Sequence, residues 1–151
     1  MRSDRLTTAL LLAGPAALLG GALGFQYIGH LYPCEMCMWQ RWALVTALAL
    51  ALLGWLLRHD RRVLAMAAMA VLVGAGIAGF HAGVEQHWWQ GFTTCTAPIV
   101  SGQDMLAQIL AQPLNRCDAI PWSLFGISMA GWNALWSTLI GGTALWRLTR
   151  V

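Results

Sequence analysis

Long stretches of apolar residues alternate with short polar segments along this chain of 151 residues. Four of these stretches carry no charge or almost none, and they cover residues 7–28, 38–57, 63–83 and 125–146. A helix rises about 1.5 Å per residue, so about 20 residues cross the hydrocarbon core of a bilayer. A helix buried in a water-soluble protein seldom reaches this length four times in one chain. The pattern predicts an all-α membrane protein, with four transmembrane helices bundled into a single domain over residues 1–151.

The basic residues indicate how these helices are oriented. All nine are arginines, and seven lie before the first stretch, between the second and third, or after the fourth: Arg2, Arg5, Arg58, Arg61, Arg62, Arg147 and Arg150. Four helices place these three segments on one side, and their positive charge marks that side as the cytoplasm. We therefore expect both termini in the cytoplasm, and segments 29–37 and 84–121 on the outer, oxidising side, where disulfides persist.

Composition agrees with a membrane protein. Hydrophobic residues make up 58% of the chain and charged ones 10%, against about 45–50% and 25% in soluble domains. The net charge of +3 is spread over the gaps between apolar stretches, so membrane lipid is an expected partner and nucleic acid is not. A cleavable signal peptide ending near Ala22–Gly24 is the alternative for the start of the chain. The apolar stretch from Thr7 exceeds the usual hydrophobic region of about 7–15 residues, so we expect a retained first helix.

The second outer segment, 84–121, is much longer than typical connections, and such loops are usually functional or disordered. Within it, Ser101-Gly102-Gln103-Asp104 resembles a helix-capping box. The next apolar residues form a stripe on one helical face, which Pro113 ends: Met105, Leu106, Ile109 and Leu110. We expect a short helix lying in the outer interface of the membrane, flanked by Cys95 and Cys117.

The four cysteines form the candidate chemistry. Cys34 and Cys37 stand where the second helix begins, so free amide groups and the positive end of the helix dipole lie near their sulfurs. A helix N-terminus and a nearby cation both lower the pKa of a thiol, and the thiolate is the reactive form. Arg41 lies one turn deeper on the same face as Cys37. An alternative for Arg41 is that it only reaches the lipid headgroups.

Metal binding and purely structural disulfides are the alternatives to redox chemistry for these cysteines. A zinc site would favour a second close pair, and Cys95 and Cys117 are 22 residues apart, so we expect no metal. Two purely structural disulfides would explain four outer cysteines. They would not explain why one pair begins a helix beside Arg41.

The segment Pro33-Cys34-Glu35-Met36-Cys37-Met38-Trp39-Gln40-Arg41 resembles the signature of the disulfide bond formation protein B (DsbB) family. The resemblance extends to the four spans, the two outer cysteine pairs and the Pro121-Trp122 entry into the last helix. It implies a thiol oxidoreductase of the bacterial inner membrane, with its cysteines in the periplasm. Such a protein reoxidises a periplasmic DsbA-like dithiol oxidase and passes the electrons to a membrane quinone, ubiquinone or menaquinone.

The resemblance also implies roles for individual residues. Cys95 would be attacked by the partner oxidase while Cys117 is released, and Cys117 would then engage Cys34. Cys37 would face the quinone, and Arg41 would stabilise the negative charge there. Some family members place a histidine beside the quinone after a glutamate near the outer end of the third helix. Here Gln86 follows the glutamate and is the candidate for that contact, with the neighbouring His87 expected to be an interface residue. His30 and His81 are expected to lie at headgroup level or to pack.

Three alternatives remain at this point. One is a related enzyme that serves a specialised oxidase with few substrates. Another is a protein similar to vitamin K epoxide reductase, although that family usually carries its quinone-facing cysteine pair on a late helix. The last is a non-enzymatic membrane protein stapled by two disulfides.

Overall fold

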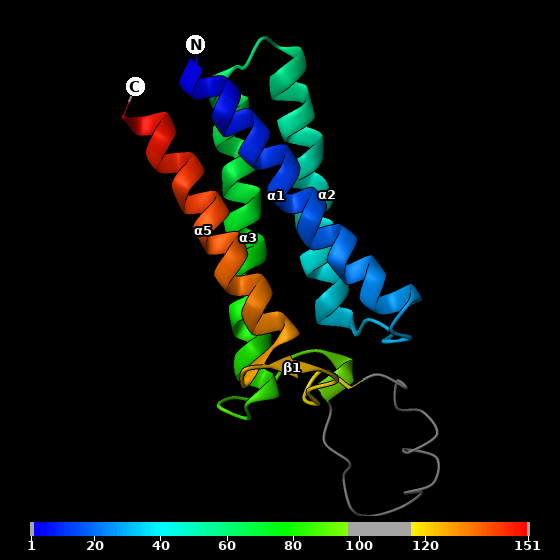
Figure 1. Cartoon of the computed structure of the whole chain (residues 1–151). Helices are drawn as coiled ribbons and strands as arrows, with labels where there is room; N and C mark the ends of the chain where they lie inside the picture. The colour runs from blue at the N-terminus through cyan, green and yellow to red at the C-terminus, as the bar shows by residue number, and fades with distance from the viewer. Residues whose placement is uncertain (1, 97–115, 151) are drawn as a thin grey trace, which may run out of the picture.

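The computed structural model describes residues 2–96 and 116–150, and it is mostly helical (Figure 1). Its long helices are α1 (Arg2–Tyr27), α2 (Glu35–Leu56), α3 (Arg61–Glu85) and α5 (Met129–Thr149). Its short elements are the 3-10 helix η1 (Thr94–Thr96) and an antiparallel hairpin of β1 (Ser123–Leu124) and β2 (Ile127–Ser128). The interfacial helix expected after Ser101 lies outside the described residues.

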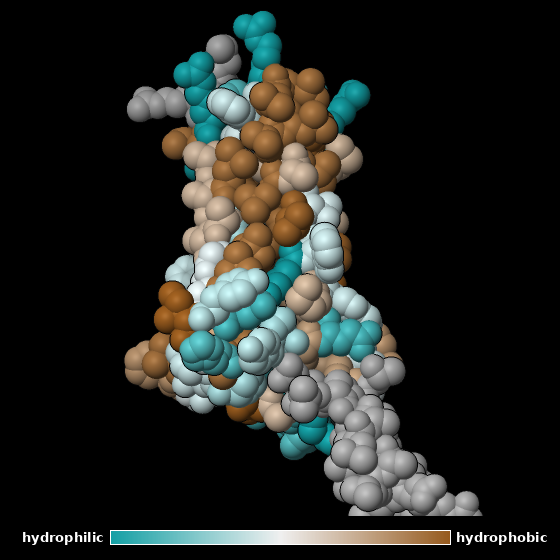
Figure 2. Space-filling model, turned by 90° about the vertical axis from the view of Figure 1, so that its right-hand side faces the viewer, coloured by the Kyte–Doolittle hydropathy of each residue, from teal (hydrophilic) through white to brown (hydrophobic). Residues whose placement is uncertain are grey.

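Three of the helices are long and apolar enough to cross a membrane: Asp4–Tyr27, Glu35–Leu56 and Arg61–Glu85. The fourth long helix, α5, has 21 residues and packs beside them. Hydrophobic side chains cover much of the helices on the face shown in Figure 2, while hydrophilic residues gather at the two ends. The chain is therefore a helical membrane protein.

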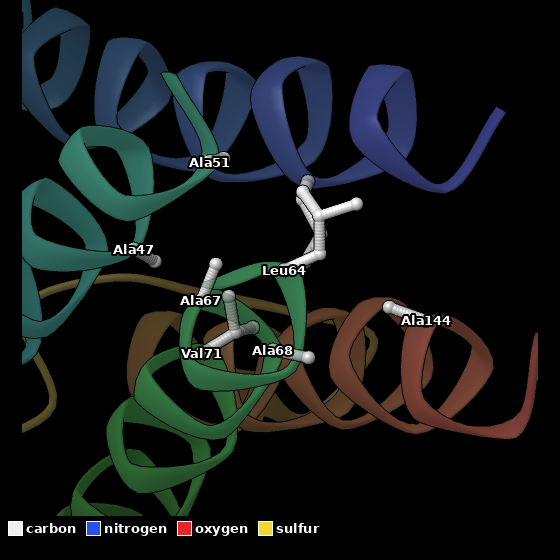
Figure 3. Close-up of a cluster of buried hydrophobic side chains, with 8 residues drawn as sticks. Ala47, Ala51, Leu64, Ala67, Ala68, Val71 and Ala144 are labelled. Carbon is white, nitrogen blue, oxygen red and sulfur yellow. The ribbon is translucent and has the colours of Figure 1, made fainter. Parts of the chain in front are cut away.

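Small residues allow the helices to approach closely. α3 packs against α2 and α5, and α1 closes the bundle against the same two helices. The buried cluster at their crossing is rich in alanine (Figure 3), and it consists of Leu11, Ala47, Ala51, Leu64, Ala67, Ala68, Val71 and Ala144. A Cβ atom at Gly141 of α5 would lie 3.1 Å from the backbone oxygen of Ala68. Such small contact residues are typical of membrane helices, whose association depends on close packing.

Polar contacts join the two termini to the α2–α3 link at one end of the bundle (Figure 1). Arg61 begins α3, donates a hydrogen bond to the Leu148 oxygen at 2.7 Å and pairs with Asp4 at 3.3 Å. Asp60 caps α3 by accepting hydrogen bonds from the amides of Arg62 and Val63. The cysteines lie at the opposite end of the helices, where α2 begins and α3 ends.

The last long helix begins at Met129, four residues later than the hydrophobic stretch predicted. Phe125 and Gly126 form the turn of the hairpin with φ of 54° and 77°, a pair of positive values characteristic of tight type I′ turns. Ser128 then caps α5 by accepting a hydrogen bond from the Gly131 amide at 3.2 Å. Phe125 is apolar although it lies in the turn, so the hydrophobic stretch in the sequence begins before the helix does.

Candidate functional site

One cysteine pair is a disulfide. Cys95, in η1, is bonded to Cys117, which follows the undescribed segment, and both are almost completely buried. The backbone also joins the two residues, because the Cys117 amide donates to the Cys95 oxygen at 3.2 Å. The Thr93 hydroxyl lies 2.9 Å from the Cys95 sulfur. The disulfide is thus buried and is held in place by backbone and side-chain contacts of the described residues beside it.

The other pair, Cys34 and Cys37, consists of free thiols at the start of α2. Cys34 is the N-cap, and its sulfur accepts a hydrogen bond from the Cys37 amide at 3.3 Å. The Cys34 thiol in turn donates to the Cys37 sulfur at 3.0 Å. This hydrogen bond to Cys37, together with burial, raises the pKa of the Cys34 thiol well above its usual range. The geometry therefore keeps a proton on Cys34 and leaves Cys37 as the acceptor sulfur.

The fold brings the two pairs into one buried cluster. Its members are Cys34, Met36, Val84, Cys95 and Cys117, with Cys37 and Phe80 packed against them. The sulfurs of Cys34 and Cys117 and a ring nitrogen of His81 all lie within 4.8 Å of one another. The Cys117 sulfur is bonded to Cys95, so it is not a thiolate, the form that binds metals. The arrangement favours exchange between sulfurs over metal binding.

His81 of α3 lies between the two pairs. Its Nε2 atom is 3.6 Å from the Cys34 sulfur and 3.2 Å from the Cys117 backbone oxygen. Its Nδ1 atom is 3.0 Å from the Gln40 amide nitrogen, and the Gln40 oxygen accepts a hydrogen bond from Asn133 at 2.7 Å. Because an amide nitrogen only donates, this chain makes Nδ1 the acceptor and leaves the ring proton on Nε2, facing the cysteines.

A cavity of about 360 Å³ adjoins the dithiol and is lined by residues of all four long helices. Most of its wall is apolar, including Phe25, Leu44, Trp122, Trp132 and Trp136. Polar groups are few and include Cys37, Gln40, Arg41, His81 and Glu85. An apolar pocket with a few convergent polar groups is the usual form of a small-molecule site. Cys37 lines this cavity, whereas Cys34 lies behind it in the sulfur cluster.

Arg41 reaches across to α1 rather than out to the end of the bundle. Its guanidinium donates hydrogen bonds to the side-chain oxygen of Gln26 and, at 3.1 Å, to the backbone oxygen of Ala22. A guanidinium has five N–H donors, so these two contacts leave others for a ligand in the cavity. The charge is thus held at the wall of the cavity, one turn from Cys37.

The structure places Gln86 away from this cavity. Gln86 is the exposed C-cap of α3, and its amide donates to the Ala82 oxygen at 3.1 Å. His87 follows with a φ of 58° and is also exposed. The residues of α3 that line the cavity are instead His81 and Glu85.

His81, Glu85 and Gln40 are site residues that sequence reasoning missed. The signal was present, because His81 is the one titratable residue within the stretch 63–83. A titratable residue inside a membrane span is expensive and by default indicates function. Glu85 follows four residues later, on the same face of α3. His81 and Glu85 mark the face of α3 that turns toward the cavity, and Gln86 lies outside that face.

A dithiol in contact with a disulfide, at one end of a helical membrane bundle, defines a membrane-embedded oxidoreductase that forms disulfide bonds. Residues 4–147 match the family described as "Disulfide bond formation protein DsbB". The chain belongs to this family, as its resemblance in sequence predicted.

Relatives named "Disulfide bond formation protein B" match along almost the whole chain. The protein from Aromatoleum aromaticum is 32% identical, covering 99% of this chain and 98% of its own length. The protein from Verminephrobacter eiseniae is 33% identical, with 99% and 88% covered, and that from Polaromonas naphthalenivorans is 31% identical, with 99% and 93% covered. No solved structure matches the chain significantly.

The two thiols of α2 should differ in reactivity. In protein with the Cys95–Cys117 disulfide intact, a small alkylating reagent such as iodoacetamide should modify Cys37 several times faster than Cys34. Cys37 lines the cavity and is the acceptor sulfur, whereas Cys34 is buried and retains its proton. Mass spectrometry of peptides from a time course would measure both rates, with Cys34→Ser as the control for assigning Cys37. Faster modification of Cys34 would contradict this assignment.

Proposed function

We propose that this protein reoxidises a DsbA-like periplasmic dithiol oxidase by disulfide exchange and passes the electrons to a membrane quinone. The observation that carries the proposal is the meeting of the two cysteine pairs. The sulfurs of Cys34 and Cys117 lie within 4.8 Å of each other, and Cys37 opens onto an apolar cavity. The two cysteine pairs can thus exchange disulfides, and of the four cysteines Cys37 alone lines the cavity.

The proposal includes a four-span topology in the bacterial inner membrane, with both termini in the cytoplasm and the cysteines in the periplasm. α5 has 21 residues, enough for about 31 Å of helix at 1.5 Å per residue, similar to the hydrocarbon core. The termini and the α2–α3 link share one end of the bundle (Figure 1), and the link carries Arg58, Arg61 and Arg62. The positive-inside rule assigns that end to the cytoplasm.

The exchange begins at Cys95, which a thiolate of the partner attacks. A bond forms between the partner sulfur and Cys95, and the Cys95–Cys117 bond breaks. Cys117 then attacks Cys34 of an oxidised Cys34–Cys37 pair, so that Cys37 leaves as a thiolate at the cavity. The second partner thiolate releases an oxidised partner and frees Cys95. Attack of Cys95 on Cys117 restores the outer disulfide and leaves the reduced dithiol that the structure contains.

The cavity fits a quinone ring. Its apolar wall suits a flat ring with a lipid tail, and the remaining donors of Arg41, one turn from Cys37, suit a carbonyl oxygen. A bound quinone would supply a two-electron acceptor that becomes a quinol. Arg41 would hold negative charge at that acceptor, and His81 would orient it beside Cys37. Trp132 and Trp136, which share one face of α5, would exclude water from the ring.

The acceptor also provides driving force. A DsbA-like oxidant has a potential near −120 mV, whereas a typical structural disulfide lies below about −300 mV. Oxidising such a partner with an ordinary disulfide would be uphill by about 8 kcal/mol, because about 30 mV corresponds to 1.4 kcal/mol for two electrons. Transfer of the electrons to quinone makes the sequence of exchanges favourable.

The topology can be tested with two single cysteines in a chain whose four native cysteines are replaced by serine. A membrane-impermeant maleimide should label Trp88→Cys on intact spheroplasts, because Trp88 is exposed at the cysteine end. Leu57→Cys, exposed at the opposite end, should be labelled only in inverted vesicles. The reverse pattern would show that the orientation is wrong.

The order of exchange predicts which intermediate accumulates. In Cys117→Ala, Cys95 is a free thiol that should attack the disulfide of an oxidised partner, so that one partner sulfur bonds to Cys95 and the other leaves as a thiolate. The mixed disulfide should accumulate, because the Cys117 thiol that would attack Cys95 and release the partner is absent. A non-reducing gel would show the larger band, and reduction would remove it. Cys95→Ala is the matched control and should give no such band. Trapping of the partner on Cys34 would reverse the proposed order, and a structural staple would trap nothing.

Arg41→Met should raise the KM for quinone about 10- to 100-fold, the loss of one hydrogen bond to a charged group worth about 1.5–3 kcal/mol. Arg41→Lys should recover part of this loss, since an ammonium lacks the planar donor fork. Gln26→Ala is the control, because it removes one of the two contacts of Arg41 with α1 but keeps the guanidinium. Steady-state kinetics with a soluble quinone would measure the effect. Equal KM values for Gln26→Ala and Arg41→Met would assign Arg41 a purely structural role.

A further inference from the structure

Glu85 is a buried carboxyl at the wall of the cavity. It is 4% exposed, and its Oε2 atom has no hydrogen-bond partner within the described part of the chain. Its carboxyl also contacts the hydroxyl of Ser128, and Nε2 of His81 lies 3.9 Å from its Oε1 atom. An unpaired buried polar atom costs about 1–3 kcal/mol, and more when charged. An unpaired carboxyl oxygen at a cavity wall indicates that the group binds a ligand or transfers a proton.

The proton balance of the proposed reaction shows what that role is. Two thiols become a disulfide when the Cys34–Cys37 bond forms, and they give up two electrons and two protons. Quinone would take up the two electrons and the two protons and become quinol. Cys37 lines the cavity, but Cys34 does not, and the nearest titratable side chain to Cys34 beyond Cys37 is His81, at 3.6 Å. The Cys34 proton therefore needs a path from the sulfur cluster to the cavity.

The hydrogen bond from Cys34 to Cys37 provides that path, because Cys37 lines the cavity together with Glu85. The Nε2 atom of His81 lies 3.6 Å from the Cys34 sulfur and 3.9 Å from the Glu85 carboxyl. Their spacing of four residues on α3 keeps both side chains on one helix face. Since Gln40 donates to Nδ1, Nε2 keeps its proton, so His81 positions the Glu85 carboxyl and carries no proton itself.

We propose that Glu85 is a catalytic proton donor of this site, which delivers a proton to a quinone oxygen and is reprotonated from the Cys34–Cys37 dithiol. As a neutral acid, Glu85 donates to the carbonyl oxygen of the quinone. The resulting carboxylate regains its proton from the Cys34 thiol, along the hydrogen bond of that thiol to Cys37, as the Cys34–Cys37 disulfide forms. Glu85 thus returns to its starting state, and protons and electrons balance. The inference depends on the proposed function, because it concerns the same quinone reduction.

Glu85→Gln is the sharpest test, because glutamine keeps the shape and the contact with Ser128 but does not carry the proton. We expect the kcat for quinone reduction to fall about 100-fold, the lower range for loss of a general acid, with the KM for quinone changed less than threefold. Trapping of a partner on Cys95 in the Cys117→Ala background should persist when Glu85→Gln is added, since that step precedes proton delivery. An unchanged kcat would overturn the role of Glu85, and loss of trapping would make the residue structural.

A second measurement needs no quinone. Infrared difference spectra between the oxidised and reduced Cys34–Cys37 pair should contain a carboxyl band in the quinone-free protein. The band should vanish in Glu85→Gln and persist in Glu35→Gln, the matched change at the exposed glutamate between the two cysteines. A band that follows Glu35 instead would refute the path. If the unmodified protein reduced no quinone at all, the proposed function would fail. Normal quinone turnover without a carboxyl band that depends on Glu85 would reject only the role of Glu85.

Discussion

The contacts of His81 with both cysteine pairs constrain the rest of the site. A buried imidazole within a membrane helix needs partners for both nitrogens, because lipid offers none. Nε2 is near the Cys34 sulfur and the Cys117 oxygen, and Nδ1 is near Gln40. These three partners come from the start of α2, its second turn and the chain after the undescribed segment. One side chain of α3 therefore fixes the relative positions of the dithiol and the disulfide.

Close packing of the helices makes these contacts possible. α3 lies against α2 and α5 through small residues such as Ala67, Ala68 and Gly141, so polar side chains can bridge the helices. Asn133 of α5 reaches Gln40 of α2 in this way, and Ser137 donates to Asn133 one turn further along α5. The polar chain from α5 to His81 is fully paired, which is what a low-dielectric interior requires of a buried network.

Much of this could be predicted from sequence, because membrane spans and cysteine spacing leave strong local signals. The apolar stretches located three helices that are long and apolar enough to cross a membrane, and the motif around Cys34 and Cys37 identified the family. The family resemblance made Gln86 the candidate for a quinone contact; Gln86 is exposed and does not line the cavity, whereas His81 and Glu85 do. Which face of α3 turns inward depends on packing with α2 and α5, a nonlocal property. The hairpin before α5 was missed because Phe125 is apolar although it forms a turn.

The two cysteine pairs share a cluster but differ in what they face, and this difference separates their chemistry. Cys95 and Cys117 form a buried disulfide that does not line the cavity. Cys37 lines an apolar cavity among the helices, which a lipid-soluble acceptor can enter and a soluble protein cannot. The proximity of the Cys34 and Cys117 sulfurs is thus the contact that joins the two environments.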